Sequence, residues 1–335
     1  MNRREIFGSA GVVVAGLIGL DARAAAETTP AETRPQTALN PPGIRTAGIR
    51  MVPVRGGQFK VWTKTIGEGP IKVLLLHGGP GAGHDYLEAM ESFLPQAGIQ
   101  MIYYDQLGCG NSDRPDDSAL WTVPGYVDEV EEVRRGLGLD QFVLYGHSFG
   151  GILTIEYALK YGQHLRGLVI SNMAAGIQAY LKRTASLKSL LDPASRARLD
   201  ALEAAGSYDD PAYGQIMMDQ LYPQMICRTK PWPEPLTRSF ARLNQKVYEQ
   251  MQGKSEFVVT GNLKGWERWD TLGRITTKAL TIGARWDEMD PADMVRMAHL
   301  MPNAQSFVCP NGSHMCMWDD QAHYFANLLP WLKAV

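Results

Sequence analysis

The sequence has almost no net charge and few cysteines, and each shortage excludes a class of protein. Its 335 residues include 33 basic and 35 acidic side chains, which gives a formal net charge of −2. This balance predicts no nucleic-acid partner, because such proteins present a basic surface. No group of histidines and cysteines has the spacing of metal ligands, so no metal ion is expected. The cysteines are expected to be free thiols, with their pairing left open; they are Cys109, Cys227, Cys309 and Cys316.

The sequence has no internal repeat, and no low-complexity block beyond its N-terminal region. The apolar stretch in that region, residues 6–20, is short for a membrane span. Arg3 and Arg4 precede it, and small alanine-rich residues suited to signal cleavage follow. The paired arginines resemble a twin-arginine export signal, so residues 1–26 predict a periplasmic or secreted protein. A plain secretory signal and an uncleaved membrane anchor are the alternatives. Residues 27–48 predict a flexible leader, and no stable membrane association is expected after signal removal.

The remainder of the chain has the composition of a globular protein, with 45% hydrophobic residues overall. Short apolar runs alternate with helix-like stretches, which is typical of a mostly parallel α/β sheet with helices on both faces. Residues 49–65, with Gly56 and Gly57 between two loosely alternating runs, predict an N-terminal hairpin. Strands are expected at residues 72–76, 99–104, 141–145, 168–170, 279–282 and 305–308. Helices are expected at residues 127–137, 152–160, 292–300 and 321–332.

The alternation of strands and helices stops between residues 174 and 272. This segment is polar and helix-like, and it contains no run that resembles a buried strand. We predict a helical cap at 174–272, which divides the core into residues 49–173 and 273–335. Open α/β sheets bind ligands outside the carboxyl ends of their strands, so the cap should cover that edge.

A serine motif lies between a predicted strand and a predicted helix. Residues 146–150 read Gly-His-Ser-Phe-Gly, with Ser148 at the centre. Its small residues allow a turn tight enough to lift the hydroxyl clear of the sheet. The helix that begins there directs free N–H groups towards Ser148, where an oxyanion would form. Ser148 is the predicted nucleophile, and the structural alternative is an ordinary glycine-rich turn.

A serine nucleophile needs a base to take its proton and a carboxylate to orient that base. Asp287 and His314 each follow a predicted strand, so both should lie at the same edge of the sheet as Ser148. The order Ser, Asp, His along the chain is that of α/β-hydrolases. Asp290 is the alternative to Asp287. The other candidates for the base either follow no strand directly or break this order; they are His299, His323, His77, His84 and His147.

A second glycine-rich segment follows the predicted strand 72–76. Residues 77–81 read His-Gly-Gly-Pro-Gly, and glycines at a strand end let the main chain approach a ligand closely. The N–H groups of Gly79 and Phe149 are therefore predicted to form the oxyanion hole. A tight structural turn is the alternative.

The loop after the predicted strand 99–104 argues against a nicotinamide cofactor. Gly108 and Gly110 are spaced as in a dinucleotide-binding loop, but residue 113 is Asp and no third glycine is correctly placed. We expect no cofactor, and we predict that this loop braces the edge of the active site.

Four segments together resemble the prolyl aminopeptidase (proline iminopeptidase) family. They are residues 77–81 (HGGPG), 105–112 (DQLGCGNS), 146–151 (GHSFGG) and 312–314 (GSH). The resemblance extends from about Ile49 to the C-terminus, and its HGGPG segment is more specific than the serine motif. It implies an α/β-hydrolase fold with an inserted α-helical cap. The export signal is not part of the family pattern.

The chain is similar in particular to the tricorn-interacting aminopeptidases, through residues 256–261 (EFVVTG) and 286–288 (WDE). Those enzymes bind the free N-terminal ammonium of the substrate with two glutamates, one in the cap and one directly after the catalytic aspartate. The resemblance implies that Glu256 and Glu288 have this role here. Two carboxylates would hold the ammonium at a fixed distance from the scissile carbonyl and reject blocked N-termini. Without the resemblance, the two residues would be interpreted as solvated charges.

These observations predict a serine exopeptidase that releases an N-terminal proline, or another small apolar residue, from small peptides through an acyl-enzyme. The first alternative is an amino-acid amide hydrolase with the same mechanism, because related enzymes cleave amino-acid amides. A carboxylesterase is the next. A binding protein without activity would require a relic triad, and the intact set of Ser, Asp and His argues against it. The sequence does not indicate the oligomeric state.

Overall fold

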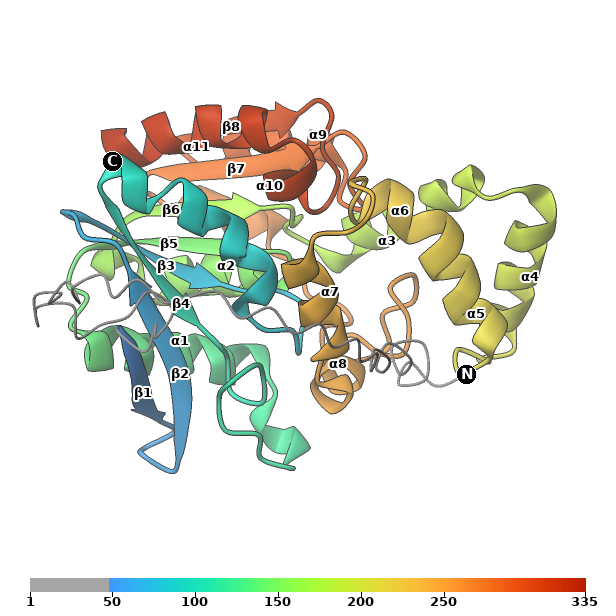
Figure 1. The fold of residues 1–335 in the computed structure, drawn as a ribbon, viewed down its shortest axis with the longest axis horizontal. Coiled ribbons are helices and arrows are strands. Elements are labelled where there is room, and N and C mark those ends of the chain that lie inside the picture. Colours follow the sequence, from blue (N-terminus) through green and yellow to red (C-terminus); the bar gives the residue numbers. More distant parts are fainter. Residues whose placement is uncertain (1–47) are drawn as a thin grey trace, which may run out of the picture.

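The computed structural model describes residues 48–335, which form an eight-stranded sheet with helices on both faces and a helical segment at one end (Figure 1). The predicted export signal and the leader up to residue 47 lie outside these described residues. Within residues 48–335, no helix has both the length and the apolarity needed to cross a bilayer.

The sheet has the order β1-β2-β4-β3-β5-β6-β7-β8. The first two strands form the predicted hairpin, and β2 also pairs antiparallel with β4, whereas all later pairs are parallel. Every predicted strand is confirmed, so the mostly parallel α/β sheet is as expected. The strands are Ile49–Val54 (β1), Phe59–Ile66 (β2), Ile71–Leu76 (β3), Ile99–Tyr104 (β4), Phe142–His147 (β5), Leu165–Ser171 (β6), Ala279–Ala284 (β7) and Ala304–Cys309 (β8).

Alternate side chains of the central strands pack against different layers of helices. Leu74 and Leu76 of β3 belong to the cluster that includes α1, α2 and α9, whereas Val73 and Leu75 belong to the cluster with η1, α10 and α11. Burial on both faces explains why the strands are continuous apolar runs. The helices are Val123–Leu137 (α1), Phe149–Tyr161 (α2), Pro291–Leu300 (α9), Cys316–Asp319 (α10), Gln321–Ala334 (α11) and the 3-10 helix His84–Ser92 (η1).

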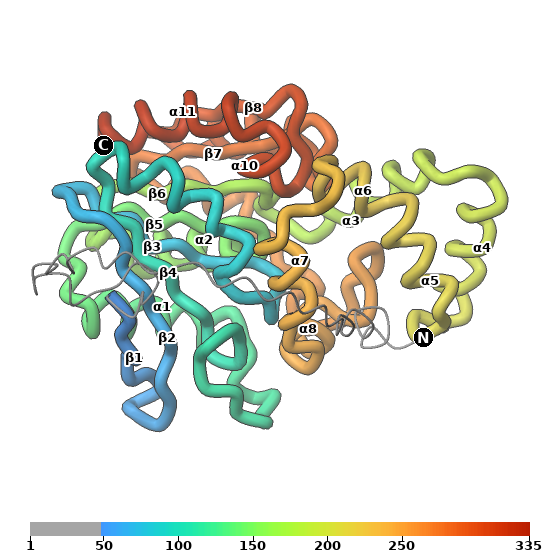
Figure 2. Tube along the Cα trace, viewed as in Figure 1, coloured from blue at the N-terminus to red at the C-terminus, as the bar shows by residue number. Residues whose placement is uncertain are grey.

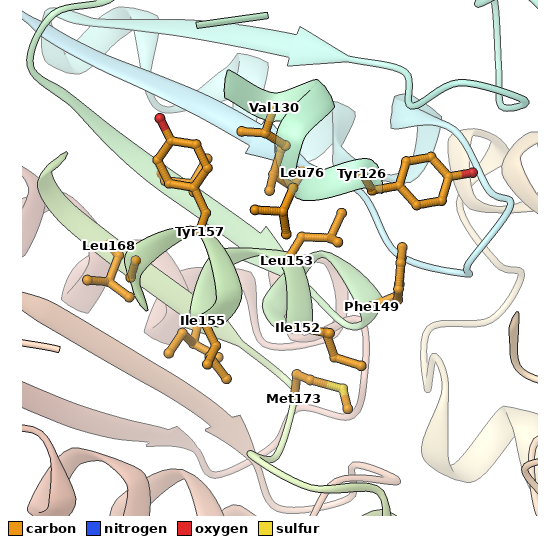
Figure 3. Close-up of a cluster of buried hydrophobic side chains, with 14 of the residues drawn as sticks. Leu76, Tyr126, Val130, Phe149, Ile152, Leu153, Ile155, Tyr157, Leu168 and Met173 are labelled. Carbon is orange, nitrogen blue, oxygen red and sulfur yellow. The ribbon is translucent and has the colours of Figure 1, made fainter. Parts of the chain in front are cut away.

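Most residues of helix α2 are buried, and Figure 3 shows its apolar side chains within a hydrophobic cluster. Leu153 lies between the sheet and α1, close to Leu76. At the N-terminal end of α2, Phe149 and Ile152 lie near Met173, which follows β6. These contacts of α2 with the core fix the position of its first turn beside Ser148.

The helical segment between β6 and β7 leaves and re-enters the core at one narrow neck. Ile177 N donates to Trp266 O at 3.0 Å, and Arg268 N donates to Ala175 O at 2.7 Å. The predicted cap limits, 174–272, lie close to this neck. Figures 1 and 2 show α4 and α5 farthest from the sheet, with α7 and α8 between them and the core. The α-helices of this segment are Ile177–Leu187 (α3), Pro193–Ala204 (α4), Pro211–Ile216 (α5), Tyr222–Met225 (α6), Glu234–Ala241 (α7) and Gln245–Met251 (α8).

Ion pairs fasten α7 to the core helix η1. Arg238 Nε lies 2.7 Å from Asp85 Oδ1, and its Nη2 lies 2.5 Å from Glu88 Oε1. Arg242 Nη1 lies 3.1 Å from the same Asp85 oxygen. Asp85 is buried, so two arginines of the cap segment neutralise one core carboxylate.

Candidate active site

Ser148 lies at the sharp turn between β5 and α2, as the sequence predicts. Its φ of 55° and ψ of −128° belong to a region that side-chain-bearing residues rarely adopt. A Cβ added at Gly146 would lie 2.1 Å from Gly150 O, and one added at Gly150 would lie 2.3 Å from Leu76 O. The motif therefore needs glycine at both positions for the strand and helix to approach this closely.

The predicted oxyanion donors, the N–H groups of Gly79 and Phe149, are both available. Phe149 is the first residue of α2, and the first amides of a helix have no partner within it. Within residues 48–335, neither amide donates a hydrogen bond to another protein atom. The neighbouring Gly78 N–H instead donates to Tyr86 Oη at 2.7 Å, which holds the glycine loop in place.

His314 and Asp287 are in direct contact. The distance from His314 Nδ1 to Asp287 Oδ1 is 2.8 Å, and Asn172 Nδ2 donates to the other carboxylate oxygen at 2.7 Å. The carboxylate thus orients the ring, and His314 Nε2 is the nitrogen left to exchange a proton. Burial alone would lower the pKa of His314, but the charges of Asp287 and Glu288 and the hydrogen bond to Asp287 raise it to about 9.

Glu256 and Glu288 form a carboxylate pair beside Ser148, since all three line the same two cavities. Glu256 Oε1 accepts from Tyr248 Oη at 2.5 Å, and its Oε2 accepts from Tyr180 Oη at 3.1 Å. Glu288 is buried, and among the described residues its Oε2 has no hydrogen-bond partner. Burial raises the pKa of Glu288 to about 8; the charge of His314 opposes this, whereas the charge of Glu256 adds to it. An unpartnered buried oxygen next to a second carboxylate is an arrangement that a cation would satisfy.

Two cavities meet at Ser148. The smaller, here called the Met173 cavity, has a volume of about 320 Å³, and the larger, the Phe240 cavity, about 600 Å³. Four residues line both of them: Gly79, Ser148, Glu256 and Glu288. The Met173 cavity is also lined by Pro80, Phe149, Ile152, Met173, Ile177, Tyr180, Gln252, Leu263 and Met289. The Phe240 cavity is also lined by Ala82, Tyr86, His147, Ile226, Ser239, Phe240, Leu243, Tyr248, His314 and Met315.

Ser148 and His314 face the same Phe240 cavity but are not hydrogen-bonded in this structure. Within residues 48–335 no hydrogen bond joins Ser148 Oγ to His314, whose Nε2 lies 3.5 Å from Glu288 Oε1. Catalytic hydrogen bonds are often long before substrate binds and shorten in the substrate complex. The imidazole therefore has Glu288 as its neighbour at Nε2, the nitrogen that the predicted triad requires to face Ser148.

The alternatives to Asp287 and His314 have other positions. Asp290 is the N-cap of α9, and its side chain accepts from Ala292 N at 2.9 Å. His299 is exposed on α9, and His323 lies on α11, where its ring packs against Phe307. None of these three residues lines either cavity.

The loop after β4 contacts the glycine-rich segment at residues 77–81. His77 Nε2 accepts from Gln106 N at 3.1 Å, and Gln106 Nε2 donates to His77 O at 2.8 Å. Asp105 accepts from His84 N and from Asn111 N, both at 2.8 Å. His77 and His84 are thus structural residues, and the predicted bracing role of the loop fits these contacts.

One group of side chains in the described part of the chain lies close enough together to hold a metal ion. It consists of His84, Asp85 and Glu88. His84 Nδ1 contacts Asp105 at 2.8 Å, and both carboxylates are paired with Arg238. These ion pairs occupy the ligand atoms, so the group is a poor metal site.

Comparison with known proteins agrees with this arrangement. A model of the alpha/beta hydrolase fold family matches residues 72–321. A proline iminopeptidase of Elizabethkingia meningoseptica is 43% identical over 292 residues, which are 85% of this chain and 98% of that protein. The chain belongs to the proline iminopeptidase family. A proline iminopeptidase of Chitinophaga pinensis is 44% identical over the same shares of the two chains. The crystal structure of a proline iminopeptidase from Mycobacterium smegmatis has a TM-score of 0.78 and 30% identity, and covers 85% of this chain and 98% of its own.

Some contacts in this member of the proline iminopeptidase family were not predicted from the sequence. Asn172, directly after β6, holds Asp287 from the side opposite His314. His147 Nε2 lies 2.8 Å from His314 O, and Tyr86 Oη lies 3.1 Å from His147 Nδ1. His147 therefore links the serine turn to the loop of the base. The position of Asn172 at a strand end was a usable signal, whereas the contacts of His147 depend on packing between distant segments.

Proposed function

We propose that the chain is a serine exopeptidase that releases an N-terminal proline, or another small apolar residue, from peptides. Its membership of the proline iminopeptidase family supports the reaction. The apolar walls of the Met173 cavity, which include Ile152, Met173 and Met289, suit a small apolar first residue. The four residues shared by both cavities support a cleavage site at their junction.

In the proposed mechanism, Ser148 Oγ attacks the carbonyl carbon and transfers its proton to His314 Nε2. Asp287 holds the ring and stabilises its charged form. The N–H groups of Gly79 and Phe149 stabilise the oxyanion, and losing one such donor typically costs about 2.7–4 kcal/mol. His314 then gives its proton to the leaving nitrogen as the C–N bond breaks. A water molecule, deprotonated by the same imidazole, hydrolyses the acyl-enzyme and regenerates Ser148.

The observation that carries the proposal is the carboxylate pair of Glu256 and Glu288. A free N-terminal ammonium would supply a donor to the unpartnered Glu288 oxygen and neutralise the repulsion between the two acids. An esterase or lipase that acts on uncharged substrates would gain nothing from two such groups beside its nucleophile. The pair therefore favours substrates with a free amine.

A comparison of free and blocked substrates tests this proposal. Prolyl-2-naphthylamide should be cleaved far faster than N-acetyl-prolyl-2-naphthylamide, because the acetyl group removes the charge. Leaving a buried charge without its partner costs about 3–5 kcal/mol, so the difference in kcat/KM should exceed about a hundredfold. The Ser148→Ala variant is the control for background hydrolysis. Equal rates for the free and the blocked substrate would exclude an aminopeptidase and favour a carboxylesterase.

The amino-acid amide hydrolase predicted as the first alternative shares this mechanism and differs in its leaving group. Ammonia would occupy little of the Phe240 cavity, whose volume of about 600 Å³ favours a larger leaving group. Prolinamide and a prolyl dipeptide, compared at equal concentration, separate the two activities. A higher kcat/KM for prolinamide would favour the amide hydrolase.

We also propose that the protein is exported through a twin-arginine signal and acts in the periplasm or outside the cell. Arg3 and Arg4, the uncharged residues 6–20 and the alanines before residue 27 support this proposal. Replacing both arginines with lysine should keep the full-length protein in the cytoplasm, as measured by cell fractionation. Export of the double-lysine variant would indicate a plain secretory signal. Recovery of the wild-type protein and the variant in the membrane fraction would indicate an uncleaved membrane anchor.

A further inference from the structure

The two cavities that meet at Ser148 differ in which part of the catalytic apparatus they contain. His314 lines the Phe240 cavity and not the Met173 cavity, whereas Phe149 lines the Met173 cavity and not the Phe240 cavity. Glu256, Glu288 and Ser148 lie at their common border. A substrate that is held by its ammonium at this border and spans it would place its two halves in different cavities.

The position of His314 decides which half enters which cavity. When the C–N bond breaks, the proton on His314 Nε2 passes to the leaving nitrogen, so that nitrogen must lie on the side of His314. The acyl half, bonded to Ser148 Oγ, then lies on the side of Phe149, whose N–H is a predicted oxyanion donor. The Phe240 cavity is therefore the cavity on the side of the leaving group.

The walls of the Phe240 cavity indicate the chemistry of the side chain that it takes. Beyond the residues shared with the Met173 cavity, most of its lining is apolar, and it comes from both the core and the cap. Tyr86 and Met315 are buried core residues, and Ile226 is a buried residue of the cap. Phe240 and Leu243 of the cap are half-buried. The hydroxyl of Tyr86 is already engaged by Gly78 N, so this residue offers its ring to a ligand.

We propose that the Phe240 cavity is a binding site for the second residue of the peptide substrate and selects a large apolar side chain there. This proposal rests on the exopeptidase function proposed above and adds a preference on the leaving side of the scissile bond. The cavity is nearly twice as large as the Met173 cavity, which suits a small first residue and a bulkier second one. Peptides with leucine or phenylalanine at the second position are the expected substrates.

A series of substrates that differ in one side chain tests the proposal. Prolinamide, prolyl-glycinamide, prolyl-alaninamide, prolyl-leucinamide and prolyl-phenylalaninamide share the same first residue and an uncharged C-terminus. Burying a leucine or phenylalanine side chain should raise kcat/KM by about ten- to a hundredfold over the glycine compound. Proline release, followed by chromatography, gives kcat/KM for each compound.

Variants in the two cavities make the test specific. Phe240→Ala and Leu243→Ala should reduce the ratio of kcat/KM between the leucine and glycine compounds severalfold, and a ratio can be measured even in a weakened enzyme. Met173→Ala is the matched control, because it should keep this ratio and instead change the preference between proline and larger first residues.

Two results would overturn the assignment. One is an equal kcat/KM for all compounds of the series in the wild-type enzyme. The other is loss of the ratio of kcat/KM between the leucine and glycine compounds in Met173→Ala while Phe240→Ala retains that ratio. The exopeptidase function has a separate readout in the comparison of free and N-acetylated prolyl-naphthylamides. A flat series together with strong rejection of the acetylated compound would therefore refute this inference alone.

Discussion

Replacing Glu288 with glutamine should change both the binding of the substrate ammonium and the pKa of His314. Glu288 Oε1 lies 3.5 Å from His314 Nε2. Burial would lower the pKa of His314, but the charges of Asp287 and Glu288 raise it to about 9. An opposite charge at this distance raises a pKa by about 1–3 pH units. Glutamine keeps the shape of the side chain and cannot carry the charge, so the pKa of His314 should fall.

The direction of the effect on activity follows from the proposed role of His314 as a base. The imidazole accepts a proton from Ser148 only when it is neutral, so kcat/KM rises as the pH rises through its pKa. In Glu288→Gln this rise should occur at a lower pH. At the same time KM for prolyl-2-naphthylamide should increase by about a hundredfold or more, because the ammonium loses a buried partner whose absence costs about 3–5 kcal/mol.

The pH dependence of kcat/KM, measured from mildly acidic to alkaline conditions, tests both effects. Glu256→Gln is the matched control, because it also removes a carboxylate from the ammonium site but leaves Glu288 beside His314. The Glu256→Gln variant should have a raised KM, but the acidic limb of its pH profile of kcat/KM should be displaced much less. The same substrate is used throughout, so titration of its own amine cancels in the comparison. An acidic limb in Glu288→Gln that coincides with the wild-type limb, or lies at higher pH, would refute the reasoning.

Three further predictions concern single contacts elsewhere in the fold. Asn172→Gly keeps the left-handed backbone at residue 172 (φ 57°) but removes the hydrogen bond to the catalytic aspartate, so kcat should fall about tenfold or more with little change in KM; an unchanged kcat would contradict this role. Gly150→Ala places a Cβ 2.3 Å from a main-chain oxygen of β3 and should cost about 3 kcal/mol or more in thermal unfolding, whereas Gly214→Ala, whose Cβ meets nothing within 4 Å, should cost far less. Burial opposes ionisation of Asp105, but its partner His84 lowers the pKa from 3.8 to about 2. The resulting stability, about 2 kcal/mol, should be present above about pH 4 and lost as the pH falls towards 2, so in urea unfolding the deficit of Asp105→Asn relative to wild type should be largest above about pH 4 and shrink towards pH 2; a deficit that does not change with pH would contradict this.

The sheet and the ends of its strands could be predicted because they depend on local pattern. Continuous apolar runs identify strands that are buried on both faces, and the parallel arrangement brings their carboxyl ends to one edge. Ser148, Asp287 and His314 each follow such a strand, so their approximate neighbourhood follows from the order of strands alone. The structure places Asp287 and His314 in contact and brings Ser148 to the same cavity.

The remaining contacts of the site depend on packing that has no sequence period. Tyr180 and Tyr248 lie on separate cap helices, and their convergence on Glu256 is set by how those helices cross. The proximity of Glu288 to His314 Nε2 likewise depends on the course of a loop. Glu256 is the exception, because the family resemblance singled it out and it lines both cavities. Residues 174–254 carry no comparable motif, so the sequence indicates that a cap exists but not which of its other side chains line a cavity.

Helix α7 forms part of the wall of the Phe240 cavity and is attached to η1 by ion pairs. Phe240 lies on α7, two residues from Arg238. The same short helix therefore carries a side chain that lines the Phe240 cavity and the charged group that attaches the helix to η1. Arg238 is partly exposed, but its partner Asp85 is buried, and dissolved ions screen such a partly buried pair much less than a pair of exposed charges. The position of this part of the wall should consequently change little with the ionic strength of the surroundings.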